Sequence, residues 1–370
     1  MMAKHGSCLE HQTGLDQLEP YVPGTPIEEV QRKYGLEDVI KLASNENPLG
    51  PSPRAVEAIR DALPRLNFYP DGQSYYLRRA LAGFLEVEPE QIAVGNGADG
   101  LIMQTCMAYL CEGTEVVVSA SSFPVYDIYT HVMRARLVKT PLKDYGIDLE
   151  AMTDAMTPET RLVFVCNPNN PTGTIVTADE VTAFMERVPD HVLVVFDEAY
   201  YEMVESDAYP ETLEYVRQGR GNVMVMRTYS KAFGLAGIRL GYAIAAPEVL
   251  APLNRVKEPF AVNLLAQAAG VAALEDREFL RRTVKTTQRE RRFLRQAFED
   301  LGFETIPSET NFMLVRFGPD ADQVHEGLMR RGVIVRPCTG YALPEFLRIT
   351  VGSREQNERL VLAVEDVLCL

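Results

Sequence analysis

The sequence predicts an α/β protein in which a large domain, with a mostly parallel sheet flanked by helices, is accompanied by a smaller α+β domain. Between residues 77 and 255, short apolar runs alternate with amphipathic stretches, a pattern typical of βαβ units. After Pro259 the pattern changes to a helix-rich, charged segment and then to further strand candidates. A chain of 370 residues also has room for about two domains.

The N-terminal region is expected to contain little regular structure. Residues 1–20 are polar and predict an arm or a short docking helix, and prolines at 20, 23 and 26 then favour an extended path. The turn-rich passage at 43–53 is long for an irregular segment in a compact chain, and such passages tend to be functional. The periodic segments are a helix at 27–34, a strand at 39–42 and a helix at 54–63.

The remaining elements divide into two groups at about residue 260. Strands of the larger sheet are expected at 91–94, 115–119, 161–166, 191–196, 223–226 and 240–245. Beyond them the sequence predicts a long helix or a broken pair at 263–300, strands at 311–317, 333–336 and 346–351, and helices at 322–331 and 355–368. The expected domains are therefore 1–44, an arm and part of the small domain; 45–260, the large domain; and 261–370, the C-terminal small domain.

The composition indicates a globular protein without nucleic-acid or membrane partners. Its 37 basic and 52 acidic residues give a net charge of −15 and a pI near 4.9, so the chain repels polyanions. An anionic substrate would have to be bound by a few local arginines. The six cysteines and five histidines show no zinc-type spacing, so no metal site is expected. Free thiols, and an N-terminus without an apolar signal segment, favour a cytoplasmic location.

Glycines follow the first strand of the larger sheet in the pattern of a dinucleotide-binding loop. Residues 95–100 match G-x-G-x-x-G, after a predicted strand and before a predicted helix. A nicotinamide site also needs an acidic residue at the end of the next strand, but that strand ends at Ser119 and is followed by Ala120, Ser121 and Ser122. We therefore retain the prediction of a phosphate-binding helix N-terminus and reject the dinucleotide.

Two other strand ends carry polar side chains suited to chemistry. Asp197 closes an apolar run and resembles the metal-binding acid of a nucleotide hydrolase, but the partner motif G-x-x-x-x-G-K-[ST] is absent. Capping of the next helix is the alternative interpretation of Asp197. Residues 167–173, Asn-Pro-Asn-Asn-Pro-Thr-Gly, either fix an asparagine amide over the same edge of the sheet or form only a rigid turn.

Lys231 lies just beyond another predicted strand, in the stretch TYSKAFGLAGIRLGY at 228–242. With Thr228, Ser230 and Arg239 it could form a cradle for an anion, because hydroxyls and exposed backbone N–H groups can all point at one phosphate. For this stretch alone, a solvated surface turn is the alternative.

Taken together, these loops supply the groups that pyridoxal phosphate requires. They provide a lysine for a Schiff base, a carboxylate for the pyridine nitrogen, amide and phenol donors for the ring oxygen, and a phosphate cradle. An aromatic side chain such as Phe123 could stack on the ring. Pyridoxal phosphate is therefore the expected cofactor.

From about Pro20 to Gly352 the chain resembles the pyridoxal-phosphate-dependent aminotransferases of fold type I. The resemblance implies a homodimer with active sites at the interface, acting on a small-molecule amino donor and a 2-oxo acid. The motifs that carry it are Pro20 to Gly24, Asn45 to Pro48, Tyr69-Pro70, the glycine loop at Gly95, Pro168 to Gly173, Asp197 to Tyr200, residues 228–242, and Leu347 to Ile349.

The resemblance also implies a role for each site residue. Lys231 would bind the cofactor covalently and move the α-proton of the substrate, and Asp197 would pair with the ring nitrogen. Asn170 and the catalytic Tyr200 would bind the ring hydroxyl oxygen, and Phe123 would stack where many relatives have tyrosine. The phosphate would be bound by the backbone of Ala98 and Asp99, the side chains of Thr228, Ser230 and Arg239, and Tyr69 from the neighbouring subunit.

Within the family, the motifs are most similar to those of members that transfer the amino group of L-histidinol phosphate to 2-oxoglutarate by a ping-pong mechanism. Arg348 would then bind a phosphate ester and a carboxylate in turn, a task that suits a guanidinium fork. Tyr21, Asn47 and Arg336 would be further substrate contacts, although Arg336 could instead form an ordinary surface ion pair. The alternative functions are a phenylalanine or tyrosine aminotransferase, a threonine-phosphate decarboxylase, and a regulatory domain that only binds pyridoxal phosphate.

Overall fold

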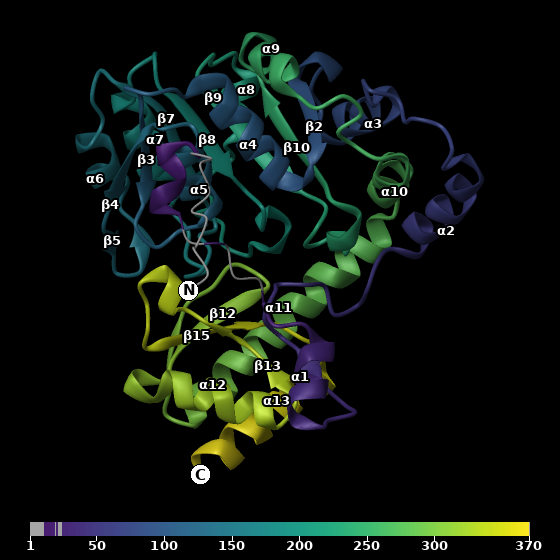
Figure 1. The fold of residues 1–370 in the computed structure, drawn as a ribbon, viewed down its shortest axis with the longest axis vertical. Coiled ribbons are helices and arrows are strands. Elements are labelled where there is room, and N and C mark those ends of the chain that lie inside the picture. The colour runs from purple at the N-terminus through teal and green to yellow at the C-terminus, as the bar shows by residue number, and fades with distance from the viewer. Residues whose placement is uncertain (1–10, 19, 21–23, 370) are drawn as a thin grey trace, which may run out of the picture.

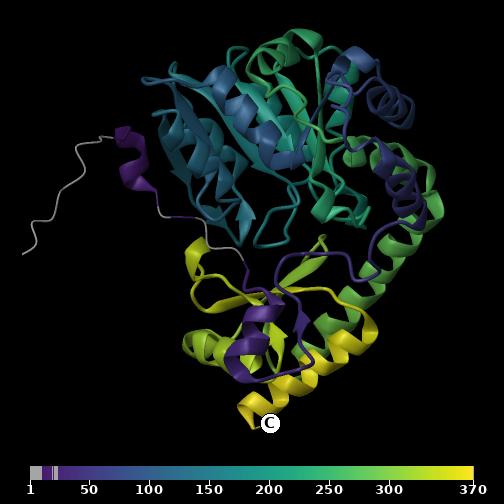
Figure 2. The same ribbon diagram turned by 45° about the vertical axis from the view of Figure 1, so that its right-hand side comes forward.

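The computed structural model describes residues 11–18, 20 and 24–369. Two lobes are visible in Figure 1, with the larger sheet in the upper lobe and the C-terminal elements in the lower one. The long helix α11 (Arg277–Asp300) runs between them, and Figure 2 shows it along one side of the molecule.

The larger sheet has seven strands in the order β2-β10-β9-β8-β7-β3-β4. β10 is antiparallel to both of its neighbours, and the other pairs are parallel. The sheet is therefore mixed but mostly parallel, as the sequence predicts. The bounds of its strands are β2 Ile92–Asn96, β3 Glu115–Ser119, β4 Arg136–Thr140, β7 Thr160–Cys166, β8 Leu193–Asp197, β9 Val223–Thr228 and β10 Leu240–Ala245.

Helices cover this sheet because its central strands are apolar on both faces. Every residue of β3, β8, β9 and β10 is buried, which requires packing above and below the sheet. Helix starts are set locally, as where Thr177 and Glu180 form a capping box. The helices of this lobe are α2 Pro53–Ala62, α3 Tyr75–Leu85, α4 Gly97–Tyr109, α5 Val125–Val132, α6 Leu149–Asp154, α7 Ala178–Arg187, α8 Leu213–Arg217, α9 Pro247–Val256 and α10 Leu264–Glu275. The short hairpin of β5 (Leu142–Lys143) and β6 (Gly146–Ile147) lies outside the sheet.

The smaller lobe is built from both ends of the chain. Its four-stranded sheet is antiparallel, in the order β11-β12-β15-β14. The N-terminal strand β1 (Ile40–Lys41) pairs in parallel with β13 (Val333–Ile334), so the start of the chain completes this lobe. Its other elements are β11 Glu304–Ile306, β12 Phe312–Arg316, β14 Arg336–Pro337, β15 Phe346–Thr350, and the helices α1 Ile27–Tyr34, α12 Ala321–Arg330 and α13 Arg354–Leu368.

The structure confirms most expected elements and corrects two. The edge strand β4 was not expected, because exposed Arg136 and Lys139 interrupt its apolar pattern. Of the two alternatives expected at 263–300, the structure shows the broken pair: α10 and α11 meet at Asp276, whose carboxylate accepts a hydrogen bond from the backbone of Phe279 and so starts a new helix. The strand expected at 333–336 is divided between two sheets. The domain boundaries remain predictions.

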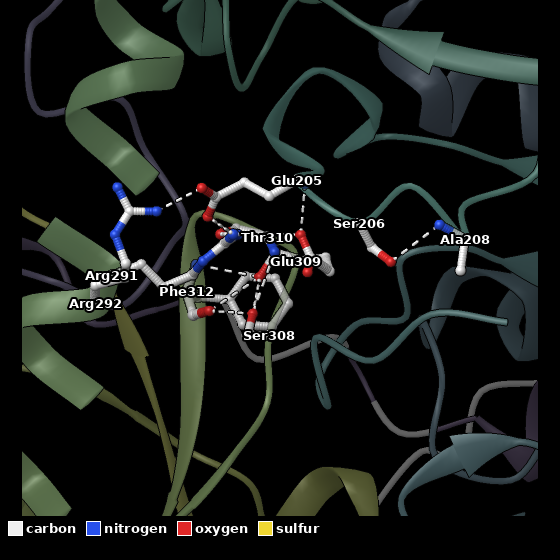
Figure 3. Close-up of polar contacts among 9 residues, drawn as sticks. All are labelled: Glu205, Ser206, Ala208, Arg291, Arg292, Ser308, Glu309, Thr310 and Phe312. Atoms are coloured by element: carbon white, nitrogen blue, oxygen red, sulfur yellow. Dashed lines mark hydrogen bonds and ion pairs between the residues drawn. The ribbon is translucent and has the colours of Figure 1, made fainter. Parts of the chain in front are cut away.

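Charged side chains join the two lobes beside the sheet edge (Figure 3). Glu205, in the upper lobe, accepts hydrogen bonds from Arg291 (2.6 Å) and Arg292 (2.5 Å) of α11. The backbone N–H of Glu205 donates to the Glu309 carboxylate at 2.7 Å, and Arg291 also donates to the Thr310 carbonyl at 2.8 Å. Only 7% of the Arg291 side chain is exposed, so this contact is partly shielded from solvent screening.

We expect Arg291→Ala to destabilise the protein by about 1 to 3 kcal/mol, because it leaves two carboxylates and a carbonyl without their shared donor. The measurement is urea denaturation followed by circular dichroism. Arg295→Ala on the same helix removes a more exposed pair with Glu299 and should change stability by about 0.5 kcal/mol or less. Equal losses of stability in the two variants would contradict the role of Arg291 in joining the two lobes.

Candidate active site

A cavity of about 120 Å³ lies where loops at the carboxyl edge of the larger sheet meet the smaller lobe. Parallel strands end at the same edge of a sheet, so residues far apart in sequence converge there. Six residues singled out from the sequence line this cavity: Phe123, Asn170, Tyr200, Lys231, Arg336 and Arg348.

Lys231 enters the cavity three residues after β9 ends at Thr228. Its Nζ donates to the Ser44 carbonyl at 3.4 Å and lies 5.6 Å from the centre of the Tyr200 ring. Burial, and secondarily the positive charge of Arg348, lower the pKa of Lys231 from 10.5 to about 8. A substantial fraction of the amine is therefore neutral, and hence nucleophilic, near physiological pH.

Asp197 is the last residue of β8 and is almost fully buried. Its Oδ2 accepts a hydrogen bond from the Tyr126 hydroxyl at 2.6 Å, and its Oδ1 accepts one from the Ala199 backbone at 3.2 Å. Burial raises the pKa of Asp197 from 3.8 to about 6, while the Tyr126 hydrogen bond opposes that rise. The carboxylate is thus mostly ionised above pH 7 and is suited to a cationic partner such as a protonated ring nitrogen.

The residues predicted to form the anion cradle lie together and contact one another. The Ser230 N–H donates to Thr228 Oγ1 at 3.1 Å, and Thr228 Oγ1 lies 3.0 Å from Ser230 Oγ. Arg239 Nη1 donates to Ser230 Oγ at 3.5 Å, and its Nη2 forms an ion pair with Asp99 at 3.0 Å. Gly97 has a φ of +73°, and a Cβ there would lie 2.5 Å from Arg239 Nη2. Glycine is therefore required for Arg239 to reach this position.

Arg348 is held from both lobes. From β15 it donates to the Ala43 carbonyl at 2.9 Å and to the amide oxygen of Asn170, in the upper lobe. Arg336 lies opposite it in the register of β14 and β15. The described residues that line the cavity include no carboxylate, so the chain's net charge of −15 coexists with a locally cationic pocket.

Three lining or supporting residues were not found from the sequence: Asn45, Tyr126 and Tyr341. Asn45 donates to the Tyr200 hydroxyl at 2.9 Å, and Arg348 donates to the Tyr341 hydroxyl at 3.4 Å. A signal existed only for Asn45, which lies in the long irregular passage marked as functional. No comparable sequence signal marks Tyr126 or Tyr341.

The other described candidate residues are not among those that line the cavity. Asn47 donates to the Ala232 carbonyl at 3.1 Å and so supports the backbone beside Lys231. Tyr69 is 82% exposed and stacks on Phe260 at 4.6 Å. Ala98 and Asp99 lie in the first turn of α4, next to the cradle, whereas Tyr21 lies outside the described residues.

The arrangement fits a phosphorylated aldehyde with a pyridine ring. A phosphate matches the cradle around Arg239, a ring nitrogen matches the buried Asp197, and an aldehyde matches the amine of Lys231. Among the described residues, no three histidine, cysteine, aspartate or glutamate side chains gather as metal ligands.

The fold and the site together define an aminotransferase. Residues 37–364 match the family described as aminotransferase class I and II, and the chain belongs to that family. It is 49% identical to the histidinol-phosphate aminotransferase of Moorella thermoacetica, over 95% of this chain and 91% of that one. The enzyme of the same name from Akkermansia muciniphila is also 49% identical, over 95% of this chain and 97% of that one.

Solved structures agree with this assignment. A crystal structure of histidinol-phosphate aminotransferase from Sinorhizobium meliloti, in complex with pyridoxal 5'-phosphate, matches with a TM-score of 0.89 and 31% identity. The match covers 98% of this chain and 99% of that one. The architecture is therefore that of the fold type I transferases.

The lowered pKa of Lys231 can be tested without any cofactor. Trapping of an aldehyde on Lys231 by borohydride, followed by mass spectrometry across pH, should show a midpoint near pH 8, since only the neutral amine reacts. Arg348→Met removes a positive neighbour and should move the midpoint upward, whereas Arg295→Met, on the exposed face of α11, should not. A wild-type midpoint near 10.5 would contradict the assignment.

Proposed function

We propose that the protein is a pyridoxal-phosphate-dependent transaminase that transfers the amino group of L-histidinol phosphate to 2-oxoglutarate, giving imidazole acetol phosphate and glutamate in histidine biosynthesis. The observation that carries the proposal is a pocket in which an amine of lowered pKa faces Arg336 and Arg348, with no carboxylate among the described lining residues. The names of the relatives, and the cofactor in the Sinorhizobium enzyme, support it.

The proposed cofactor would be held at its ring and at its phosphate by separate groups. Lys231 would carry it covalently, Asp197 would bind the ring nitrogen, and Phe123 would cover the ring. Asn170 and Tyr200 would donate to the ring oxygen. Its phosphate would lie among the backbone of Ala98 and Asp99 and the side chains of Thr228, Ser230 and Arg239. When bound, pyridoxal phosphate supplies an electron sink for the carbanion formed at the substrate carbon.

The residues of the chain would then bind, orient and move protons. Lys231 would take the proton from the amine-bearing carbon and return it, a role that its pKa of about 8 favours. Burial raises the pKa of Tyr200 well above its usual value, so its phenol remains a hydrogen-bond donor. Asn45 and the ring of Phe312 pack against Tyr200 and fix its orientation.

Arg348 would bind the two substrates in turn. Its planar guanidinium group matches both the phosphate ester of histidinol phosphate and the α-carboxylate of glutamate. Arg336 would add a second positive charge. Asn47 would act through the backbone it supports, and Tyr21 would be a further contact. An aromatic amino acid aminotransferase remains the second candidate, because Phe123 and Tyr341 also line the cavity.

We also propose a homodimer whose sites lie at the interface. Phe68, Tyr69 and Tyr76 are 64%, 82% and 78% exposed, and Leu63 and Leu66 are exposed beside them, which is unusual for large apolar side chains. A second subunit covering this surface would bring Tyr69 to the neighbouring phosphate cradle.

A cytoplasmic location is supported by the free thiols of the five described cysteines. The described part of the chain contains no helix able to cross a membrane.

Lys231→Ala should abolish transamination, because no other lysine lines the cavity among the described residues. The assay measures glutamate formed from 2-oxoglutarate, and it should show a higher kcat/KM for histidinol phosphate than for phenylalanine. A preference for phenylalanine would favour the aromatic aminotransferase. Release of carbon dioxide from threonine phosphate without 2-oxoglutarate would instead identify a decarboxylase.

A hybrid-dimer experiment tests the shared site. Lys231→Ala and Tyr69→Ala subunits should each be impaired alone, but co-expression should restore activity, since one hybrid site keeps both Lys231 and the neighbouring Tyr69. Co-expression of Lys231→Ala and Arg239→Ala subunits is the matched control. It should not restore activity, because Arg239 is expected to act in the same subunit as Lys231. If Tyr69→Ala had no effect on cofactor affinity, the interface assignment would be wrong.

A further inference from the structure

Tyr126 is a fully buried residue beside Asp197, and the proposed function gives it no role. It lies in the first turn of α5, and its hydroxyl donates to Asp197 Oδ2 at 2.6 Å. Its ring stacks on Phe164 of β7, with centres 4.5 Å apart and planes 9° apart. The Tyr126 ring also makes an edge-to-face contact with Phe123, with centres 5.7 Å apart and planes 84° apart. One side chain thus contacts both Asp197 and Phe123.

We infer that Tyr126 is a positioning residue, which fixes the Asp197 carboxylate and the Phe123 ring relative to each other and so sets the slot for the cofactor ring. This inference rests on the proposed function, because it assigns the nitrogen of the ring to Asp197 and its face to Phe123. Phe164 prevents the Tyr126 ring from tilting, so the direction of its hydroxyl is determined by packing. Asp197 cannot rotate without losing that hydrogen bond.

The surroundings of Asp197 make this donor electrostatically important. Burial, and to a lesser extent the negative charges of Asp99 on α4 and of neighbouring Glu198, raise the pKa of Asp197. From β7, Cys166 contributes a thiol whose pKa burial raises to about 12, so it stays neutral. From β9, the residue paired with Asp197 is the apolar Met226. Tyr126, whose own pKa is raised well above 10 by burial, opposes these effects as a permanent donor.

The alternative is that Tyr126 only fills space, and Tyr126→Phe separates the two roles. The substitution keeps the ring and its stacking but removes the hydroxyl, so packing changes little. Tyr229→Phe is the matched control, because Tyr229 is equally buried and its hydroxyl has no hydrogen-bond partner among the described residues.

The first readout is thermal unfolding of the full chain without added cofactor, between pH 5 and pH 8. A carboxyl group whose pKa is raised by folding makes the protein less stable as the pH rises from the pKa of the group in the unfolded chain to its pKa in the folded chain. Without the Tyr126 hydroxyl, the pKa of Asp197 should rise above about 6. The deficit in Tm relative to wild type should therefore be larger at pH 8 than at pH 5 in Tyr126→Phe and independent of pH in Tyr229→Phe. In an Asp197→Asn background, Tyr126→Phe should show no pH-dependent deficit.

The second readout is the kinetics of the holoenzyme with its amino donor. Tyr126→Phe should lower kcat on the order of tenfold and leave KM nearly unchanged, because the defect lies in orientation of the cofactor ring rather than in substrate binding. The inference would be overturned if the Tm deficit of Tyr126→Phe did not depend on pH and its kcat were unchanged. It would also be overturned if Tyr229→Phe changed Tm and kcat in the same way. Because the unfolding experiment contains no cofactor or substrate, it remains informative if wild-type protein fails as a transaminase, a result that would overturn only the proposed function.

Discussion

The hydrogen-bonded ladder of the parallel strands β7, β8 and β9 is the constraint on which the site depends. Cys166 pairs with Asp197, and Asp197 pairs with Met226, so the three strands end almost level. The segments that follow β7 and β9 carry Asn170 and Lys231 to one cavity, and Asp197 ends the strand between them. A register shift of one residue would turn Asp197 to the other face of the sheet.

A buried ion pair strengthens this alignment on the opposite face. Glu198 directly follows β8 and Arg227 is the penultimate residue of β9, and their side chains meet at 2.8 Å with 0% and 4% exposure. The Glu198 backbone N–H also donates to the Met226 carbonyl at 2.8 Å. Such a pair adds little net stability relative to apolar residues, but loss of one partner would leave the other charge buried and unpaired. Its physical effect is to disfavour any other register.

The architecture was largely predictable from the sequence because its strong signals are local. Buried strands such as β3 are continuous apolar runs, and glycine and proline mark the loops between them. The edge strand β4 escaped prediction because it is partly exposed, and the break within 263–300 was expected only as an alternative because its position at Asp276 depends on a single cap. Lys231 and Asp197 were found as polar residues at strand ends. Tyr126 was not, because its role arises from a contact with Asp197 that sequence spacing does not encode.

The parallel pairing of β1 with β13 has a consequence for how the protein is made. Ile40 leaves the ribosome long before its partner Val333 is synthesised. The N-terminal helix α1 packs on the same pair, so it cannot reach its final position until most of the chain has emerged. The larger sheet, in contrast, lies wholly within the intervening residues and can form first. During translation, the apolar face of α1 must therefore remain shielded from aggregation until the C-terminal lobe arrives.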